Sequence, residues 1–189
     1  MKLSTEFYRQ DDVTAVAKQL IGMVICTQID GVLTSGIITE TEAYAGITDR
    51  ASHAFGGRRT KRNEVMYGGP GVAYVYLCYG IHHLFNVVTN AESVPHAVLL
   101  RAIKPLEGES VMLQRRGLQK SGSRFTGGPG TASAALGIKT SMNGIPLSGD
   151  KIWIEDRGLQ VPEHQILATP RIGVAFAGED AQLPYRFIG

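Results

Sequence analysis

Two glutamates and a tyrosine alternate along one predicted strand, and a histidine follows them. Glu40, Glu42 and Tyr44 occupy every second position of a segment that opens with isoleucines, so a strand would place all three side chains on one face. Glu is depleted in strands. After a loop that contains glycine comes His53. The pattern predicts a pocket where a carboxylate, a phenol and an imidazole converge; an edge strand with a polar outer face is the alternative.

The preceding segments would anchor this strand. A short helical stripe ended by Gly22 precedes a strand predicted at Met23–Thr27. Asp30-Gly31 is typical of a tight hairpin turn, so the returning strand would run over Val32–Tyr44. Glu42 would then lie at the far end of a long, rigid element, which is a suitable place for a catalytic group.

Composition narrows the class of protein. The 189 residues are 43% hydrophobic and 19% charged, as in an ordinary soluble domain. No run approaches the roughly 20 apolar residues of a membrane span, and the polar N-terminus does not resemble a secretory signal. Cys26 and Cys78 lie in apolar, strand-like runs without metal-ligand spacing, which favours buried thiols in a reducing compartment.

Basic residues are clustered, although the net charge is only +2. Residues 50–62 carry five basic side chains and no acid, and residues 101–124 carry six basic and two acidic ones. Clusters of this kind are typical of a polyanion partner, while a solvated basic loop explains either one alone. The first cluster lies in a long loop rich in Gly and Arg over residues 45–70, and loops of this length tend to be functional or disordered.

A second informative segment predicts a β-hairpin. Tyr74–Leu77 and Leu84–Thr89 are rich in strand-forming residues, and Tyr79-Gly80 lies where the chain would reverse. At such a tip Tyr79 could project and insert between base steps, as large side chains do in proteins that distort DNA. The alternative is that Tyr79 packs in the core, as aromatic residues usually do.

Two further features suggest anion contacts. A short buried strand at Ala97–Leu100 is expected to end at Arg101, which would need a carboxylate such as Glu42 nearby or would lie at the surface. The glycine-rich turn Gly127–Gly130 precedes an Ala-rich helix predicted at Thr131–Leu136. Helix N-termini suit phosphates, although an ordinary turn before an ordinary helix gives the same pattern.

These segments predict a mixed α/β fold. Additional strands are expected at Lys151–Glu155 and Arg171–Phe176, with a short helix over Glu107–Arg116. We expect a single compact domain over residues 1–189, with a curved, largely antiparallel sheet, flanking helices and a protruding β-hairpin.

The order of several blocks resembles the alkyladenine (3-methyladenine) DNA glycosylase family. The similarity extends over nearly the whole chain, and several ungapped blocks in one order are more specific than any single motif. The blocks are ETEAY at 40–44, His53, GGRRTKRN at 56–63, PGVAYVYLCYG at 70–80, Asn86, VLLRAIKPLEG at 98–108, GGPG at 127–130 and RIGVAFAGE at 171–179.

The resemblance implies a monofunctional DNA glycosylase of base excision repair. Such an enzyme flips an alkylated or deaminated purine (3-methyladenine, 7-methylguanine, hypoxanthine or ethenoadenine) out of duplex DNA, and water hydrolyses the N-glycosidic bond to leave an abasic site. Glu42 matches the general base that activates the water. Arg101 matches the arginine that holds the water and the carboxylate, and the backbone carbonyl of Ile172 would complete this site.

The resemblance also assigns binding roles. Tyr44 and His53 match residues that sandwich and recognise the flipped base, with Tyr76 on the opposite wall. Asn86 matches a pocket residue that discriminates against the amino group of guanine. Tyr79 matches the residue that fills the gap in the base stack. The DNA backbone would be contacted by basic residues and by the helix start, namely Arg58, Arg62, Gly128, Gly130 and Thr131.

The implied enzyme needs no metal and no cofactor. Its partner is double-stranded DNA that contains damaged purines, it has no membrane partner, and we expect it to act as a monomer. It would work in the cytoplasm or nucleoid of a bacterium, or in the nucleus of a eukaryote, and would not be secreted. Ile81, His82 and His83 stand where some relatives have bulkier aromatic residues, so the tip of the hairpin can differ in shape.

Three other functions stay open on the sequence. A nucleoside or glycoside hydrolase would use Glu40 and Glu42 as a carboxylate pair. A lesion-binding protein would bind damaged DNA without releasing a base. A bifunctional glycosylase–lyase would need an amine nucleophile, and Lys61 is the only lysine close to these blocks.

Overall fold

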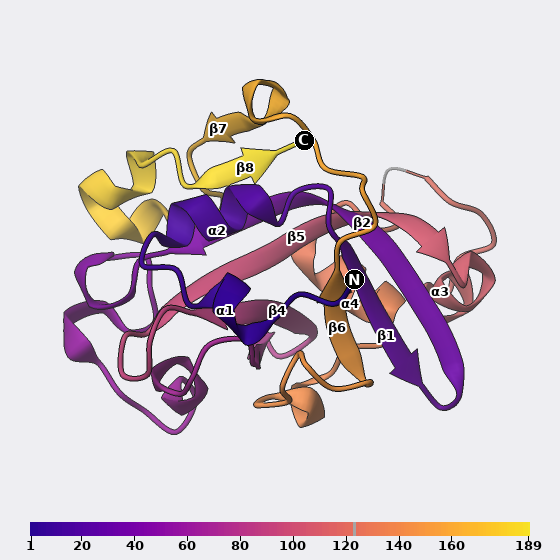
Figure 1. The fold of residues 1–189 in the computed structure, drawn as a ribbon, viewed down its shortest axis with the longest axis horizontal. Coiled ribbons are helices and arrows are strands. Elements are labelled where there is room, and N and C mark those ends of the chain that lie inside the picture. The colour runs from indigo at the N-terminus through magenta and orange to yellow at the C-terminus, as the bar shows by residue number, and fades with distance from the viewer. Residues whose placement is uncertain (123) are drawn as a thin grey trace.

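A curved antiparallel sheet of eight strands organises the computed structural model, which describes residues 1–122 and 124–189 (Figure 1). The strands are β1 (Val24–Ile29), β2 (Val32–Tyr44), β3 (Ala73–Cys78), β4 (His82–Thr89), β5 (His96–Glu107), β6 (Ile152–Glu155), β7 (Leu167–Thr169) and β8 (Arg186–Ile188). Their order is β3-β4-β5-β2-β1-β6, and β8 pairs with both β2 and β7. The predicted α/β class and antiparallel sheet are confirmed.

Short helices flank the sheet. The α-helices are α1 (Thr5–Tyr8), α2 (Val13–Gln19), α3 (Glu109–Arg116) and α4 (Pro129–Leu136). The 3-10 turns are η1 (Gly46–Thr48), η2 (Phe55–Gly57), η3 (Glu64–Tyr67), η4 (Thr140–Met142), η5 (Glu163–Gln165) and η6 (Ala175–Gln182). Asp12 caps α2 by accepting hydrogen bonds from the backbone N–H groups of Thr14 and Ala15. Within the described residues, no helix is long and apolar enough to cross a membrane.

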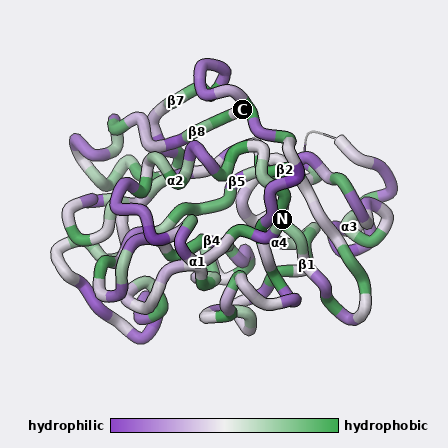
Figure 2. The backbone as a smooth tube through the Cα atoms, in the orientation of Figure 1, coloured by the Kyte–Doolittle hydropathy of each residue, from purple (hydrophilic) through white to green (hydrophobic). Residues whose placement is uncertain are grey.

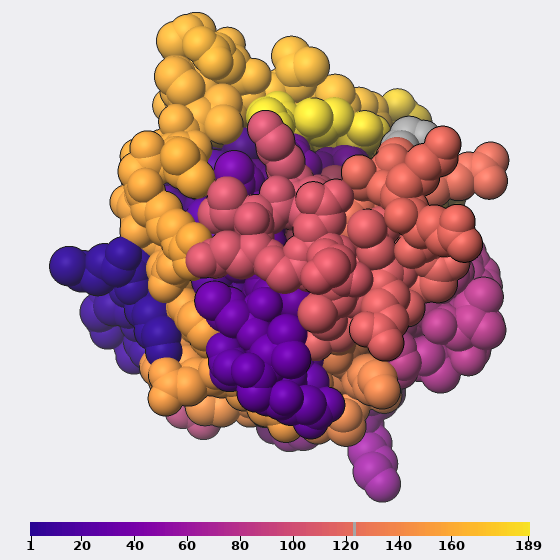
Figure 3. All heavy atoms as spheres, turned by 90° about the vertical axis from the view of Figure 1, so that its right-hand side faces the viewer, coloured from indigo at the N-terminus to yellow at the C-terminus, as the bar shows by residue number. Residues whose placement is uncertain are grey.

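Strand β2 has the predicted bounds and joins three neighbours. The turn before it places Asp30 at φ 52° and Gly31 at φ 77°, the left-handed conformation that a two-residue hairpin requires. The first half of β2 pairs with β1, the second half pairs with β8, and nearly the whole strand pairs with β5. Figure 3 shows the β1–β2 hairpin in violet, between the pink segment from β5 into α3 and the orange later part of the chain. The Glu40–Tyr44 end is therefore held on both sides.

The core lies where α2 and α4 pack on the sheet. Val16 and Leu20 from the α2 region, Phe85 from β4 and Leu136 from α4 are all at most 1% exposed. Burial of one such side chain stabilises the fold by about 1.5–3 kcal/mol. Hydrophobic stretches gather along β4, β5 and α4 in Figure 2, while hydrophilic stretches follow the peripheral loops. This core makes the sheet a rigid support for the side chains at its edge.

The expected end of a strand at Arg101 is wrong. Strand β5 continues through Arg101 to Glu107, and Ala102 and Ile103 beyond it are buried and paired with β2. Arg101 itself is only 9% exposed and lies near the middle of the strand. Arg101 can interrupt the apolar run of β5 because its side chain pairs with the carboxylates of Glu40 and Glu42. These partners lie on another strand, so the order of residues along the chain does not reveal them.

The predicted strand at Arg171–Phe176 is also wrong. This segment is a loop that leads into η6, with Gly173 at φ 78°. Ile172 and Phe176 are 50% and 75% exposed, and the loop lines a cavity instead of pairing with the edge of β2 that β1 leaves open. The edge is paired instead by β8, a strand that was not predicted.

The segment between β2 and β3 and the hairpin after it shape the remaining edge. Residues 45–72 contain three 3-10 turns, so the long loop is folded and not featureless. Strands β3 and β4 pair antiparallel from Ala73↔Val87 to Cys78↔His82, as expected. Tyr79, Gly80 and Ile81 connect them, with Tyr79 at φ 51°.

Candidate active site

The predicted catalytic and base-binding residues, together with Tyr79, line one cavity of about 420 Å³ at the end of β2. Its wall is built from β2, β3, β4 and β5, from the 45–72 segment and from the loop after β7. The cavity is lined by Glu42, Tyr44, His53, Tyr76, Tyr79, Asn86, Arg101 and Ile172, among others. Residues from distant parts of the chain therefore meet at one place.

Glu42 is fully buried and is held by two hydrogen-bond donors and one ion pair. The backbone N–H of Ile172 donates to Oε1 at 2.7 Å, and the hydroxyl of Tyr44 donates to Oε2 at 2.8 Å. Nη1 of Arg101 lies 3.4 Å from Oε1. A buried carboxylate is costly unless it is paired and hydrogen-bonded, and these contacts meet that requirement. The resemblance pointed to the carbonyl of Ile172, but the contact in the structure is made by its N–H; the role of the carbonyl stays a prediction.

Arg101 joins two carboxylates. Its Nε donates to Oε1 of Glu40 at 2.8 Å, a shorter contact than the one to Glu42. Glu40 also accepts from Nε of Arg186 on β8 at 2.7 Å. Unlike Glu42, Glu40 is not among the residues that line the cavity. The two glutamates share a strand face, as predicted, but occupy different environments.

Tyr44 contacts Glu42 from the same strand. Burial raises the pKa of its hydroxyl well above the usual value, and the neighbouring Glu42 carboxylate adds to the shift. The hydroxyl therefore stays protonated and donates. The guanidinium of Arg171 lies 4.8 Å from the centroid of the Tyr44 ring, which is a cation–π arrangement.

His53 packs against two tyrosines of β3. Its Nδ1 lies 2.8 Å from the hydroxyl of Tyr74, and its ring meets that of Tyr76 edge to face at 4.7 Å. Burial lowers the pKa of His53 to about 4, with help from the charges of Arg62 and Arg58. The imidazole is therefore neutral at pH 7. Burial also raises the pKa of Tyr74 to about 12.

Asn86 and Tyr79 lie at opposite extremes of exposure. Asn86 is 3% exposed, and its Nδ2 donates to the carbonyl of Tyr74 at 3.1 Å. Tyr79 is 90% exposed, so the expectation that it packs in the core is wrong for this residue. Tyr74 and Phe85 of the same hairpin do pack in the core, since they are 1% and 0% exposed.

Most of the predicted backbone-binding residues do not line the cavity. Arg62 lines the cavity, with its guanidinium 4.8 Å from the Tyr76 ring centroid, and Arg58 is exposed nearby in sequence. Helix α4 begins at Pro129, earlier than expected. Thr131 accepts the N–H of Gly128 at 3.0 Å and so caps the helix. Gly130 lies so close to the β3–β4 hairpin that an added Cβ would be 2.9 Å from the ring of His82.

The sequence did not predict the buried ion pair between Arg171 and Asp49, which lies next to Tyr44. Both terminal nitrogens of Arg171 donate to Asp49, with one contact at 2.8 Å, and Nη1 also donates to the carbonyl of Ala43 at 2.9 Å. The side chains of this pair are 0% and 1% exposed. Arg171 directly precedes Ile172, so the pair fixes the loop that reaches Glu42. An arginine inside an apolar run was the available signal.

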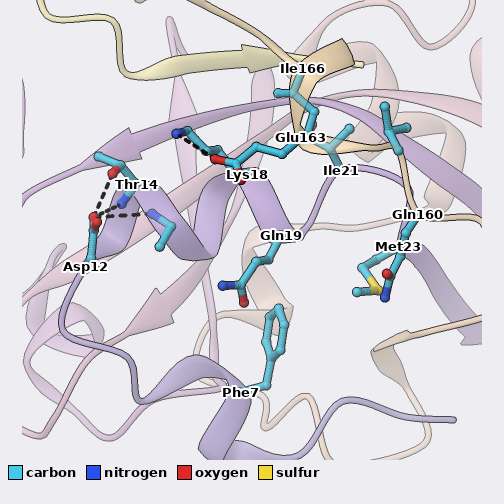
Figure 4. Close-up of a pocket in the computed structure, with 12 residues that line it drawn as sticks. Phe7, Asp12, Thr14, Lys18, Gln19, Ile21, Met23, Gln160, Glu163 and Ile166 are labelled. Atoms are coloured by element: carbon cyan, nitrogen blue, oxygen red, sulfur yellow. Dashed lines mark hydrogen bonds and ion pairs between the residues drawn. The ribbon is translucent and has the colours of Figure 1, made fainter.

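A second cavity lies beside α2 (Figure 4). It has a volume of about 590 Å³. Its charged groups are already engaged: Asp12 caps α2, and Lys18 lies 3.5 Å from Glu163. Phe7, Ile21 and Met23 add apolar surface. It is the larger cavity, but it does not bring together acid, imidazole and aromatic side chains as the first one does.

Comparison with known proteins identifies one family. The model of the methylpurine-DNA glycosylase (MPG) family matches residues 6–189. A protein of Chlamydia felis is 46% identical over 98% of this chain and 95% of its own length. Proteins of Desulfitobacterium hafniense and Bacillus cytotoxicus are 43% and 44% identical, over 98% and 99% of this chain and 94% and 95% of their own lengths. All three bear the name "Putative 3-methyladenine DNA glycosylase".

The family match and the relatives define the class of this protein as an enzyme that hydrolyses N-glycosyl bonds. The chain belongs to the methylpurine-DNA glycosylase family, as the match over nearly its whole length shows. It is a DNA glycosylase of base excision repair, and its substrate is DNA. The resemblance noted in the sequence is confirmed.

Proposed function

We propose that this enzyme is a monofunctional glycosylase that flips damaged purines out of duplex DNA and hydrolyses their N-glycosidic bond with a water activated by Glu42. The observation that carries the proposal is the Glu42 carboxylate, held by fixed donors in a cavity with aromatic walls. The glycosidic carbon gains oxocarbenium character as the bond breaks, so one carboxylate can orient the water and stabilise the developing positive charge. The product is an abasic site.

Glu42 retains a place for the water. A carboxylate has about four acceptor positions. Ile172 and Arg101 approach Oε1, and Tyr44 takes one position on Oε2. We assign the second position on Oε2 to the nucleophilic water. Positioning of the nucleophile by fixed groups lowers the barrier by several kcal/mol in favourable cases, with about 7–11 kcal/mol as the upper range.

The flipped base would be sandwiched and recognised by Tyr44 and His53, with Tyr76 on the opposite wall. We assign the hydroxyl of Tyr74 as the donor to Nδ1 of the neutral His53, which leaves the ring proton on Nε2. Nε2 would then donate to an acceptor on the purine. Asn86 would restrict the space available to the amino group of guanine. These roles follow the resemblance and agree with the cavity lining.

Contacts with the rest of the duplex would offset the cost of flipping. Unstacking a base costs a few kcal/mol and is cheapest for damaged or mispaired bases. The exposed ring of Tyr79 would fill the gap in the stack. Arg58, Arg62 and the start of α4 at Gly128, Gly130 and Thr131 would contact phosphates. We assign the whole activity to residues 1–189 as one domain that acts as a monomer.

The substrate range is tested with a panel of duplexes. Each carries one 3-methyladenine, 7-methylguanine, hypoxanthine or ethenoadenine, and an undamaged duplex is the control. The names of the relatives make 3-methyladenine the first lesion to try. We expect release of free base from at least one damaged duplex and no trapping by borohydride. Trapping would indicate an amine nucleophile such as Lys61, and binding without release would indicate a lesion sensor.

A further inference from the structure

Glu40 is the common acceptor of two arginines beside the site. Its Oε1 accepts from Nε of Arg101 at 2.8 Å and from Nε of Arg186 at 2.7 Å. The Glu40 side chain is 14% exposed, and those of Arg101 and Arg186 are 11% and 21% exposed. None of the three therefore makes an ordinary surface ion pair, whose contribution would be small.

The sheet register explains why these charges meet. Glu40 lies opposite Ala102 on β5 and Ile188 on β8, with register shifts on both sides of it in the pairing with β5. Arg101 has no partner in that register, which leaves its side chain free to reach two residues of β2. Arg186 lies opposite Glu42 but bonds diagonally to Glu40. The C-terminal strand is thereby tied to the site.

Arg101 has a planar guanidinium with a rigid fork of donors. Fixing Nε on Glu40 also fixes the direction of Nη1, which stays 3.4 Å from Oε1 of Glu42. Without Glu40, the guanidinium would be free to close on Glu42 as a bidentate pair. Such a pair would occupy both carboxylate oxygens, including the Oε2 position assigned above to the water.

The geometry points to Glu40 as a positioning residue that holds Arg101 at a fixed distance from Glu42 and keeps the acceptor site of Glu42 open. This inference rests on the proposed function of Glu42. Glu40 touches neither the base nor the water, and it acts through Arg101. The role differs from that of a second catalytic carboxylate, because Glu40 is engaged by two arginines and does not line the cavity.

The test combines single-turnover base release with DNA binding. The variants are Glu40→Gln, Glu40→Ala, Arg101→Ala and the Glu40→Ala/Arg101→Ala double variant. Glu107→Gln is the control, since Glu107 also lies on the sheet and accepts from an arginine, Arg157, away from the cavity. Misplacement of a reacting group by about 1 Å can cost about 10²-fold in rate. We expect Glu40→Ala to lower the single-turnover rate about 10²-fold and Glu40→Gln, which keeps an acceptor, about tenfold, with the Kd for the same duplex unchanged.

The double variant separates positioning from a general structural effect. If Glu40 acts through Arg101, Glu40→Ala causes no further loss in the Arg101→Ala background. A rate loss that multiplies there, or a wild-type rate in Glu40→Gln and Glu40→Ala, would overturn the inference. Thermal unfolding of each variant identifies any that fails to fold; Glu40→Gln has the same shape as the native side chain and carries the test if Glu40→Ala unfolds.

Failure of the proposed function gives a different result. No base release by the wild type, or undiminished release by Glu42→Gln, would contradict the function of Glu42 itself. Equal and complete loss in Glu40→Gln and Glu42→Gln would instead favour a pair of catalytic carboxylates. Wild-type release that is lost only in Glu42→Gln would overturn the role of Glu40 alone.

Discussion

The backbone N–H of Ile172 lies 2.7 Å from Oε1 of Glu42, although the two residues are 130 positions apart in the chain. The loop that supplies this donor is fixed by its neighbour Arg171, which is paired with Asp49 behind Tyr44. The candidate base is therefore oriented by a segment from the C-terminal part of the chain. A change that destabilises the loop of Arg171 and Ile172 should therefore also change the orientation of the Glu42 carboxylate.

Removal of one charge from this pair should be costly. Asp49→Asn leaves the buried Arg171 without its carboxylate, and we expect a loss of about 3–5 kcal/mol in the free energy of unfolding, measured by urea denaturation. Asp150→Asn is the control, because Asp150 pairs with Lys2 at an exposed site. Its stability should be close to that of the wild type. Equal losses in both variants would show that the Arg171 pair has no special role.

The pKa of His53 makes stability depend on pH. Burial lowers it from its ordinary value of 6.5 to about 4. Between these values the unfolded chain binds a proton at His53 and the folded chain does not, so stability falls as the pH drops from about 6.5 to about 4. His53→Asn should lack this contribution, whose slope reaches at most about 1.4 kcal/mol per pH unit. The measurement is the free energy of unfolding against pH.

The control for His53 is His164→Asn, at an exposed histidine outside the cavity. It should follow the wild-type curve. If His53→Asn and the wild type lose stability in parallel over this range, the imidazole is not kept neutral by burial.

Tyr79 should affect DNA binding without affecting folding. Its ring is 90% exposed, so Tyr79→Ala removes little packing. Stacking of a base on an aromatic ring is worth about 1–3 kcal/mol, and we expect the affinity for a damaged duplex to fall about tenfold or more. Leu167→Ala is the control, since Leu167 is 63% exposed on β7 and does not line the cavity. A lower unfolding temperature for Tyr79→Ala with unchanged affinity would contradict this role.

The basic segment offers an internal comparison for salt dependence. Each phosphate contact contributes about 0.9 to the slope of log K against log salt. The double variant Arg58→Gln/Arg62→Gln should therefore reduce the slope by about 1.8. Arg59→Gln should change it much less, because Arg59 already pairs with Glu64 at 2.5 Å. An unchanged slope in the double variant would exclude Arg58 and Arg62 from the interface.

The sequence predicted features that arise locally. Strand β2 was predicted with its bounds because Asp30-Gly31 and the alternation after it specify a hairpin. Glu42, Tyr44 and His53 were predicted to meet from strand alternation, and the resemblance added Tyr76, Asn86 and Ile172, all of which line the cavity. The partners of the charges could not be predicted, since Glu40 meets Arg186 only through the pairing of β2 with the C-terminal strand. The apolar pattern at Arg171–Phe176 was misread because its exposed residues lie over a cavity and not in a sheet.

The most direct test compares the wild type with Glu42→Gln. Each protein is mixed in excess over a duplex that carries one lesion that the wild type releases. Free base and bound DNA are measured in the same sample. We expect Glu42→Gln to bind the duplex as tightly as the wild type and to release base at least 10²-fold more slowly, as for loss of a general base. Release at the wild-type rate by a folded Glu42→Gln would contradict the assignment of Glu42 as the residue that activates water.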